Sequence, residues 1–236
     1  MVQYIVGPLE MVGLLNVAIV QLTIAFFPWP LRRWMLERIY GFKLDRDARI
    51  GFSLIRCRRL TMKSGSRIGH CNFINGLDFL ELGVQARIGN LNWITGFPAG
   101  NVEFFALDRD RMPILTIGEH AAVTHRHFID CTDHVEIGAF SIVAGWRSQI
   151  YTHAIDINEN RQMANRVVIG THCFVGTGVI ILKGAVLPNC CVLGAGSVLT
   201  TALHDEFTLY VGNPAVAVRE LDPNAKYFHR KIGFVH

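Results

Sequence analysis

The chain has 236 residues, half of them hydrophobic and 18% charged, with a formal net charge of +4. This composition excludes a disordered tail protein, and the length suits one large domain with a substantial core. The mild positive charge suits an anionic ligand or a lipid surface, but no arginine-rich run or zinc-finger spacing is present, so we expect no nucleic-acid partner. Six cysteines form no CxxC pair, which predicts reduced thiols in a cytoplasmic protein.

The first predicted element is an apolar segment from Met11 to Phe27. A helix of that length would extend ~26 Å, short of the ~30 Å hydrocarbon core of a bilayer. Three interpretations are open: a helix packed on its own domain, an interfacial or re-entrant membrane anchor, and a full membrane span. The "WPLRRW" stretch that follows, from Trp29 to Trp34, resembles an interfacial belt with cytoplasmic positive charge. We therefore favour association with the inner face of the cytoplasmic membrane over the packed helix, and both over a span.

From Ile50 onward, aliphatic residues recur every six positions and are often followed by glycine. The longest run is Ile169, Val175, Ile181, Leu187, Leu193 and Leu199, and earlier runs begin at Ile68 and Ile117. Six is neither a helical period nor a simple strand alternation, but it fits a short strand plus a tight turn. Three such units close one triangular coil with the aliphatic side chains inside, and stacked coils bury a continuous core. We expect the glycine after the aliphatic residue to permit the corner geometry.

The repeat has irregularities in its earlier half. Two units have eight residues, from Leu80 to Ile88 and from Ile129 to Ile137, which predicts aligned coils with a two-residue bulge at one corner. The register is lost from Ile94 to Ile117 and again from Gly145 to Gly170. Loops that leave a rigid scaffold often carry function. In the first interruption we expect Phe104 and Phe105 to pack on the β-helix, with acceptor binding as the alternative.

This pattern resembles the hexapeptide-repeat acyltransferases over residues 46–220, most specifically over 117–219. The resemblance implies an all-β fold, a left-handed parallel β-helix with an N-terminal hydrophobic helix and a short C-terminal extension. The expected organisation is a helical segment at 1–45, a β-helix domain at 46–203 with loops at 95–116 and 149–167, and an extension at 204–236. The family also implies a homotrimer with the catalytic cleft between neighbouring β-helices.

The second interruption contains "YTHAID", which is similar to the Thr-His-Pro-(Ile/Leu)-Asp motif of sugar O-acetyltransferases in this family. The resemblance implies that His153 is the general base, with Asp156 as the second catalytic residue and Ala154 where proline is common. The stretch "FIDCTDHVEIG" resembles a family stretch whose aspartate contacts the acceptor, here Asp130. The remaining predicted acceptor-binding residues are His125, which stands where the family often has asparagine, and Trp146 and Arg147 at the start of the interruption.

The chemistry of these residues suits acyl transfer. A sugar hydroxyl is a poor nucleophile until its proton is removed, and an imidazole that is half-protonated near neutral pH can take that proton and pass it to a leaving thiolate. Of the ten histidines, His153 alone combines a break in the register with the motif.

The later coils contain "VGTGVI", "VLGAGSVLT" and "VGNPAVAVREL", which resemble coenzyme A-binding stretches of the family. The resemblance implies acetyl-CoA as the acyl donor, with Lys183 and Arg219 near its phosphates. The alternative for the glycines is that they form tight corners. The full predicted donor-binding set is Gly176, Gly178, Lys183, Ala195, Gly196, Ser197, Thr200 and Arg219.

The sequence therefore predicts an acetyl-CoA-dependent O-acyltransferase that modifies a sugar. The hydrophobic N-terminal segment favours a lipid-linked glycan acceptor, as in cell-surface polysaccharide or O-antigen biosynthesis. One alternative is a zinc enzyme like the β-helix carbonic anhydrases, but their histidine spacing of four is absent, since His120 and His125 are five apart. We therefore expect no metal. The other alternative is a non-catalytic scaffold recruited to the membrane.

Overall fold

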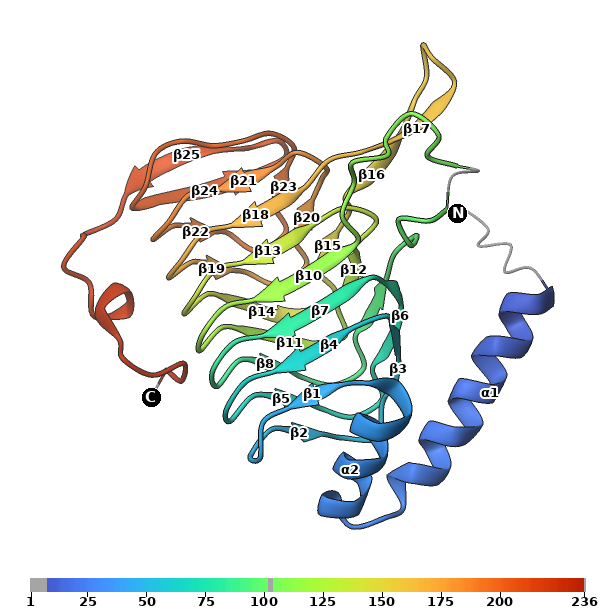
Figure 1. Ribbon diagram of the computed structural model, residues 1–236. Coiled ribbons are helices and arrows are strands. Elements are labelled where there is room, and N and C mark those ends of the chain that lie inside the picture. The colour runs from blue at the N-terminus through green and yellow to red at the C-terminus, as the bar shows by residue number, and fades with distance from the viewer. Residues whose placement is uncertain (1–7, 102–103, 236) are drawn as a thin grey trace.

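The computed structural model describes residues 8–101 and 104–235. Its main body is a left-handed β-helix, in which three sheets form the sides of a triangular prism and the chain passes through sheets A, B and C in turn (Figure 1). Strands pair in parallel with the strand of the next coil, except for β24 and β25, which pair antiparallel. The predicted fold class is confirmed.

The strands of each sheet are short. Sheet A contains β1 (Lys43–Leu44), β4 (Leu60–Met62), β7 (Phe79–Leu82), β10 (Ile114–Ile117), β13 (Val135–Ile137), β18 (Val167–Ile169) and β21 (Val186–Leu187). Sheet B contains β2 (Arg49–Ile50), β5 (Arg67–Ile68), β8 (Arg87–Ile88), β11 (Ala122–His125), β14 (Ile142–Trp146), β19 (Phe174–Val175), β22 (Val192–Leu193), β24 (Thr208–Gly212) and β25 (Ala215–Glu220). Sheet C contains β3 (Leu54–Cys57), β6 (Phe73–Leu77), β9 (Trp93–Thr95), β12 (Phe128–Asp130), β15 (Gln149–Ile150), β20 (Ile180–Ile181) and β23 (Val198–Leu199).

The core is the inside of the prism. The aliphatic residues of the six-residue repeat stack in register from coil to coil; in sheet C, for example, Ile74, Ile94, Ile129 and Ile150 follow one another. All four are buried. Burying one such side chain contributes about 1.5–3 kcal/mol, so the stack supplies a continuous core that no single coil has.

The glycines after the aliphatic residues have a different role from the one that the sequence predicts. Gly69 is not in the left-handed region of φ. A Cβ atom on it would lie 2.4 Å from the carbonyl oxygen of Gly89 in the next coil. Glycine is therefore needed there because neighbouring coils approach closely. Positive φ values instead occur one to two residues later, at positions such as His120, Phe140 and His172.

The two-residue bulges lie at one corner, where the chain leaves sheet C and enters sheet A. Ile129 and Ile137 flank a two-residue bulge there, as predicted. In the coil before the first interruption, Leu82 is the residue in register with Ile117 and Ile137, so the eight-residue unit runs from Ile74 to Leu82 and not from Leu80 to Ile88. Both interruptions leave the prism at this same corner, the C–A corner. A smaller register shift lies at the corner between sheets B and C, where His125 is opposite Trp146.

Helix α2 (Trp29–Tyr40) lies at the N-terminal end of the prism next to β1, and α1 (Pro8–Ala25) runs along the side of the prism next to β3 (Figure 1). The Gln21 amide bonds both the N–H (2.8 Å) and the carbonyl oxygen (2.6 Å) of Ile55, at the outer edge of sheet C. Ile24 is buried beside it. Within the described residues, no helix is long and apolar enough to cross a membrane, and α1 packs on its own domain.

The C-terminal segment returns along the prism. A 3-10 helix, η1 (Lys226–His229), follows β25, and the Tyr227 hydroxyl donates to the carbonyl oxygen of Cys173 (3.0 Å). The Arg230 guanidinium donates to the carbonyl oxygen of Phe140. These contacts hold the C-terminal segment against the corner between sheets A and B.

Candidate active site

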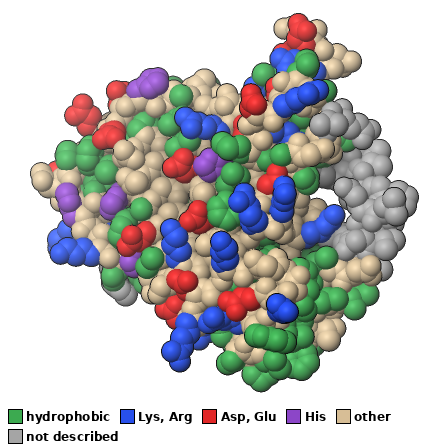
Figure 2. Space-filling view, in the orientation of Figure 1, with side chains coloured by type: hydrophobic (Ala, Val, Ile, Leu, Met, Phe, Trp, Pro, Cys, Tyr) green, Lys and Arg blue, Asp and Glu red, His purple; other side chains and the backbone are tan. Residues whose placement is uncertain are grey.

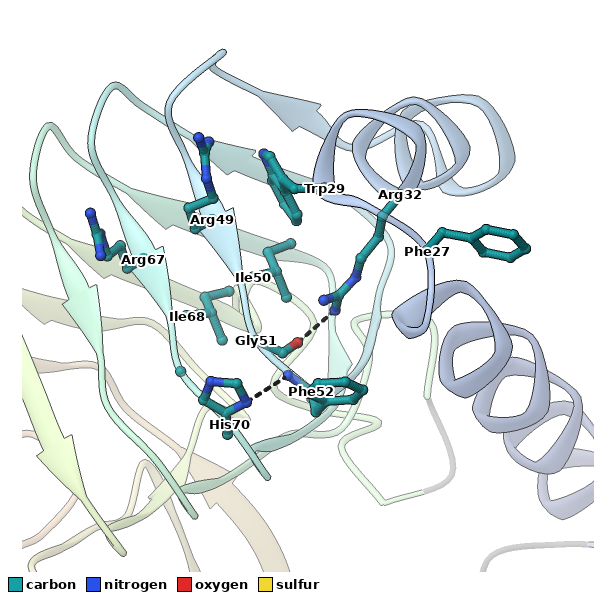
Figure 3. A pocket seen from close by; sticks show the side chains of 11 residues that line it. Phe27, Trp29, Arg32, Arg49, Ile50, Gly51, Phe52, Arg67, Ile68 and His70 are labelled. Atoms are coloured by element: carbon teal, nitrogen blue, oxygen red, sulfur yellow. Dashed lines mark hydrogen bonds between the residues drawn. The ribbon is translucent and has the colours of Figure 1, made fainter.

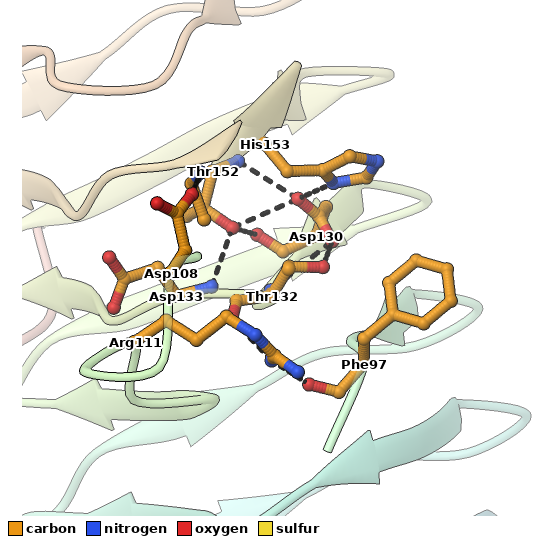
Figure 4. Close-up of polar contacts among 9 residues, drawn as sticks. Phe97, Asp108, Arg111, Asp130, Thr132, Asp133, Thr152 and His153 are labelled. Carbon is orange, nitrogen blue, oxygen red and sulfur yellow. Dashed lines mark hydrogen bonds and ion pairs between the residues drawn. The ribbon is translucent and has the colours of Figure 1, made fainter. Parts of the chain in front are cut away.

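Two irregularities of the C–A corner place the candidate catalytic residues next to each other. Asp130 is the last residue of β12, directly before the two-residue bulge. His153 is the first residue of β16 (His153–Asp156), which pairs antiparallel with β17 (Arg161–Ala164) in a hairpin that projects from the prism. His153 Nδ1 lies 2.7 Å from Asp130 Oδ2 (Figure 4). The interruption of the repeat thus places His153 outside the packed coils, where it contacts Asp130 of the preceding coil.

The Asp130 carboxylate is held by a complete set of donors. Its Oδ1 accepts from the hydroxyl (2.6 Å) and backbone N–H (3.2 Å) of Thr132, and its Oδ2 accepts from the backbone N–H of Thr152 (2.9 Å) and from His153. The carboxylate is fully buried. Burial alone would raise its pKa, but the hydrogen bonds and the charge of His153 outweigh burial and lower the pKa below the ordinary value. Asp130 is therefore ionised near neutral pH.

This environment fixes the tautomer of His153. An ionised carboxylate only accepts hydrogen bonds, so the proton of the neutral imidazole is on Nδ1. The lone pair is then on Nε2, at the far end of the ring from Asp130 (Figure 4). The side chain is 13% exposed, and no hydrogen bond to Nε2 is formed by any described residue. The imidazole is thus oriented as a base whose reactive nitrogen is available.

Two aromatic rings of the first interruption stand edge-on to this imidazole. The ring centroid of Phe97 lies 5.9 Å from that of His153, and the centroid of Phe105 lies 6.1 Å away. Phe105 is buried, whereas Phe104 is 47% exposed. The expected packing therefore holds for Phe105, which contacts the imidazole itself, whereas Phe104 packs with one side on Phe97, at 5.6 Å between ring centroids, and exposes the other. An apolar wall beside the imidazole excludes water from one side of the base.

A buried arginine that the sequence did not single out organises this loop. The Arg111 guanidinium donates to the carbonyl oxygens of Phe97, Pro98 (2.6 Å), Asn101 (3.1 Å) and Thr132 (3.2 Å). It also lies 4.4 Å from the ring centroid of Phe105. Arg111 thereby ties the β9–β10 loop to the bulge that follows Asp130. An arginine in a polar loop has no sequence signal that would distinguish this role from a solvated charge.

The same loop is attached to the hairpin. Asp108 Oδ2 accepts from the backbone N–H of Ala164 (2.7 Å), and its Oδ1 lies 3.5 Å from Arg161 Nη1. Ala164 is the residue opposite His153 in the hairpin. The loop and the hairpin, which are 56 positions apart at this contact, therefore form one structure around the imidazole.

The structure places Asp156, the second predicted catalytic residue, away from His153. Asp156 lies at the far end of β16, opposite Arg161, where its Oδ1 accepts from the backbone N–H groups of Asn158 and Glu159. Side chains three positions apart on a strand point to opposite faces, so Asp156 shapes the hairpin turn. The carboxylate beside the imidazole is Asp130. Both oxygens of Asp130 accept from protein donors, and its contact with the acceptor stays a prediction.

The other predicted acceptor-binding residues lie at a different corner, where the chain passes from sheet B to sheet C. His125 and Trp146 are in register there, and Trp146 is 52% exposed with the Arg126 guanidinium 4.6 Å from its ring centroid. Arg147 is exposed at the same corner. Sheet C separates these three residues from His153, and their roles stay predictions.

The predicted donor-binding residues divide between the two edges of sheet C. Gly176, Gly178, Ala195, Gly196 and Ser197 lie at the B–C corner, and Lys183 and Thr200 lie at the C–A corner below the hairpin. A Cβ atom on Gly178 or Gly196 would meet nothing within 4 Å, so both face open space. Ser197 is buried, and its hydroxyl accepts from the N–H of Gly212 (3.1 Å). Arg219 is exposed on β25.

Comparison with known proteins gives similar folds at low identity. No protein-family model matches the chain. A hexapeptide transferase family protein from Anaplasma phagocytophilum is 17% identical with a TM-score of 0.49, covering 77% of this chain and 87% of its own. A hexapeptide-repeat acetyltransferase from Vibrio cholerae is 15% identical (TM-score 0.47; 90% and 92% covered), and a maltose O-acetyltransferase from Clostridium difficile is 18% identical (TM-score 0.41; 92% and 90% covered).

Across the described part of the chain, no three His, Cys, Asp or Glu side chains are grouped so that they could hold a metal ion. The three solved structures are hexapeptide transferases and acetyltransferases, which is the group of proteins that the sequence of this chain resembles.

Proposed function

We propose that this protein transfers an acetyl group from acetyl-CoA to a hydroxyl group of a sugar, with His153 as the general base. The observation that carries the proposal is the His153–Asp130 pair, in which a buried, ionised carboxylate holds the Nδ1 proton and leaves Nε2 available. The same pairing of imidazole and carboxylate activates hydroxyl nucleophiles in acyl-transfer sites on unrelated folds.

The reaction follows from that geometry. Nε2 takes the proton of the sugar hydroxyl as its oxygen bonds to the carbonyl carbon of the thioester. When the tetrahedral adduct collapses, the C–S bond breaks and the imidazolium returns the proton to the leaving thiolate. Asp130 stabilises the imidazolium in between, because its carboxylate stays ionised. A positioned base of this kind contributes ~10²–10⁴-fold to the rate.

The position of the predicted donor-binding residues supports acetyl-CoA as the donor. Lys183 lies on the same corner as His153, in the coil that follows the hairpin, where an ammonium group suits a phosphate of the donor. Gly178 and Gly196 leave open space at the other edge of sheet C, where an extended pantetheine arm can lie close to the backbone.

The acceptor in this proposal is a lipid-linked glycan, modified at the cytoplasmic face of the membrane during cell-surface polysaccharide or O-antigen assembly. The support is the apolar N-terminal region, whose exposed side chains include Phe26 and Trp34.

A homotrimer, as the sequence resemblance implies, would place the corner of one prism against its neighbour. Sedimentation of the full chain measures that oligomeric state.

The test is the release of coenzyme A from acetyl-CoA over a panel of sugars and lipid-linked sugars. His153→Ala is compared with wild type and with His204→Ala, which removes an exposed histidine outside the site. We expect one acceptor to support turnover that falls at least ~10²-fold in His153→Ala only. Equal turnover in all three proteins would refute the role of His153, and the absence of acetyl-CoA binding would refute the acyltransferase.

A further inference from the structure

A pocket of about 400 Å³ lies at the N-terminal end of the prism, between the α1–α2 turn and the first coils of sheet B. Its lining includes Trp29, Arg32, Arg49, Arg67 and His70, and it contains no Asp or Glu (Figure 3). Figure 3 shows Arg49 and Arg67 extending side by side from neighbouring strands, with Trp29 beside Arg49. The pocket, near α2 at the bottom of Figure 1, is far from the hairpin that carries His153, which projects from a middle coil at the top.

The arginines of this region form a ladder of like charges. Arg49, Arg67 and Arg87 are in direct register on adjacent strands of sheet B, and adjacent strands are about 4.8 Å apart. Like charges placed directly opposite each other destabilise a sheet. Burial lowers the pKa of Arg87, and so does the charge of Arg67. No carboxylate lies within 4.0 Å of these three guanidinium groups among the described residues.

The nearby acidic group does not neutralise the ladder. Asp47 feels the charge of Arg49, but its Oδ2 accepts from the Ser64 hydroxyl (2.9 Å) and it does not line the pocket. Two further donors of the lining, Trp29 Nε1 and Arg32 Nε, are buried without a hydrogen-bond partner. Arg32 itself is 8% exposed. Leaving such donors unsatisfied costs stability, and the lining of the pocket has no acidic side chain that could accept from them.

Exposed apolar side chains lie on the helices and the turn next to this cationic pocket, and one of them, Phe27, lines it. The largest are on α1, α2 and the turn between them: Ile19, Leu22, Phe26, Phe27, Leu31 and Trp34, with exposed fractions of 42–83%. Figure 2 shows hydrophobic side chains gathered at this end of the molecule. A contiguous apolar patch of this kind marks a binding surface. A soluble anion would use the arginines but would leave these side chains in water.

We propose that this end of the protein docks on an anionic phospholipid bilayer, with a lipid phosphate in the pocket between Arg32, Arg49 and Arg67. Guanidinium groups bind phosphate oxygens in pairs, and aromatic and aliphatic side chains beside them enter the headgroup and acyl boundary. The surface combines both features, as bilayer contact requires and a purely polar ligand does not. Phe26, on the α1–α2 turn, is the most exposed of the apolar group and therefore the first to enter the bilayer. This inference does not depend on the proposed acyl transfer.

The experiment is co-sedimentation of the full chain with vesicles of phosphatidylcholine alone and of equimolar phosphatidylcholine and phosphatidylglycerol. Arg49→Gln/Arg67→Gln is compared with Arg109→Gln/Arg166→Gln, which removes two exposed arginines from the loop and hairpin region. Phe26→Ser (83% exposed) is compared with Ile157→Ser (87% exposed), on the hairpin.

We expect wild type and both control variants to bind the anionic vesicles. Each arginine near an anionic surface contributes about 1 kcal/mol, so Arg49→Gln/Arg67→Gln should bind about 30-fold more weakly. Phe26→Ser should also bind more weakly. The substitutions relieve repulsion between the arginines but remove the bonds from Arg49 to the carbonyl oxygens of Arg46 and Ala48, so the melting temperature should stay within a few degrees of wild type. Its measurement separates lost binding from lost folding.

Two results would overturn the proposal. One is that the anionic vesicles do not bind wild type, or that they bind the pocket variants with the same affinity as the control variants. The other is that inorganic phosphate or glycerol phosphate raises the melting temperature of wild type, and not of Arg49→Gln/Arg67→Gln, while no vesicle binds. That second result would assign the pocket to a soluble phosphate compound.

Discussion

At the scale of single residues, the account depends on Asp130 and His153. Asp130→Asn keeps the size of the side chain but replaces an ion that only accepts with an amide that also donates. The amide can no longer hold the Nδ1 proton of His153 and stabilise the imidazolium. We expect kcat for acetyl transfer to fall by about 10² or more, while acetyl-CoA binds with unchanged affinity. A matched Asp156→Asn, at the hairpin turn, should keep most activity; equal losses in the two variants would contradict the assignment of Asp130.

His127 gives a prediction for stability rather than activity. It is 2% exposed, the Ser148 N–H donates to its Nδ1 (3.2 Å), and its Nε2 lies 2.9 Å from the Thr124 hydroxyl. Burial, with a smaller effect of His125, lowers its pKa to about 4. The unfolded chain takes up the proton near its ordinary value of about 6.5. The unfolded state therefore binds more protons between about pH 6.5 and pH 4.

Neutral His127 therefore makes its full contribution to the free energy of unfolding above about pH 6.5. This contribution, on the order of 3 kcal/mol, is lost as the pH falls towards about 4. Urea unfolding at several pH values measures it. We expect a steeper fall in the free energy of unfolding for wild type than for His127→Gln, with exposed His204→Gln as the control. Parallel curves for all three proteins would show that His127 is not held neutral.

At the scale of elements, the β9–β10 loop and the β16–β17 hairpin build the site together. Arg111→Met removes the donors to four carbonyl oxygens and should release the loop. Each buried carbonyl left without a donor costs about 1–3 kcal/mol. We expect protease cleavage within the loop, and lower acetyl transfer because Phe97 and Phe105 no longer hold their positions beside His153. Arg109→Met, on the same loop but exposed, should remain resistant; a resistant Arg111→Met would contradict the role of Arg111.

The close approach of the coils gives a prediction for the repeat itself. A Cβ on Gly69 would lie 2.4 Å from the Gly89 carbonyl oxygen, whereas a Cβ on Gly100 would meet nothing within 4 Å. Gly69→Ala should therefore lower the free energy of unfolding by about 1–3 kcal/mol, as overpacking does. Gly100→Ala should change it by less than about 0.5 kcal/mol. Thermal or urea unfolding of both variants measures this, and a neutral Gly69→Ala would contradict the close packing of these coils.

At the scale of the whole molecule, the sequence predicts the prism well, because its period sets the fold. Every sixth aliphatic residue must point inward, and the shared irregularity predicts that the coils align. The sequence also locates His153, since the register breaks there. The partner of His153 could not be found in this way, because Asp130 and His153 are 23 positions apart and meet only when the coils stack. The resemblance implies Asp156 only as a second catalytic residue, and in the structure that side chain lies on the opposite face of β16 from His153.

The other differences between the sequence-based predictions and the structure also arise from contacts between residues that are distant in the sequence. Arg111 and Phe97 act through contacts between a loop and a bulge on successive coils, which a periodic pattern does not encode. The role of the glycine after each aliphatic residue depends on the spacing between coils. The N-terminal segment is apolar enough to suggest a membrane span, but Gln21 bonds Ile55 and fixes α1 on its own domain. One hydrophobic segment can thus pack on a sheet and still present Leu22 and Phe26 to the outside.

The proposed role of His153 as the base for acyl transfer can be tested in a single experiment. Donor binding by calorimetry and transfer of a labelled acetyl group from acetyl-CoA to the acceptor are measured together for wild type and His153→Gln. Glutamine keeps a polar side chain that can still hydrogen-bond Asp130 but cannot take a proton. The account predicts equal donor affinity and transfer at least ~10²-fold slower in the variant. Transfer at the wild-type rate by His153→Gln would contradict it.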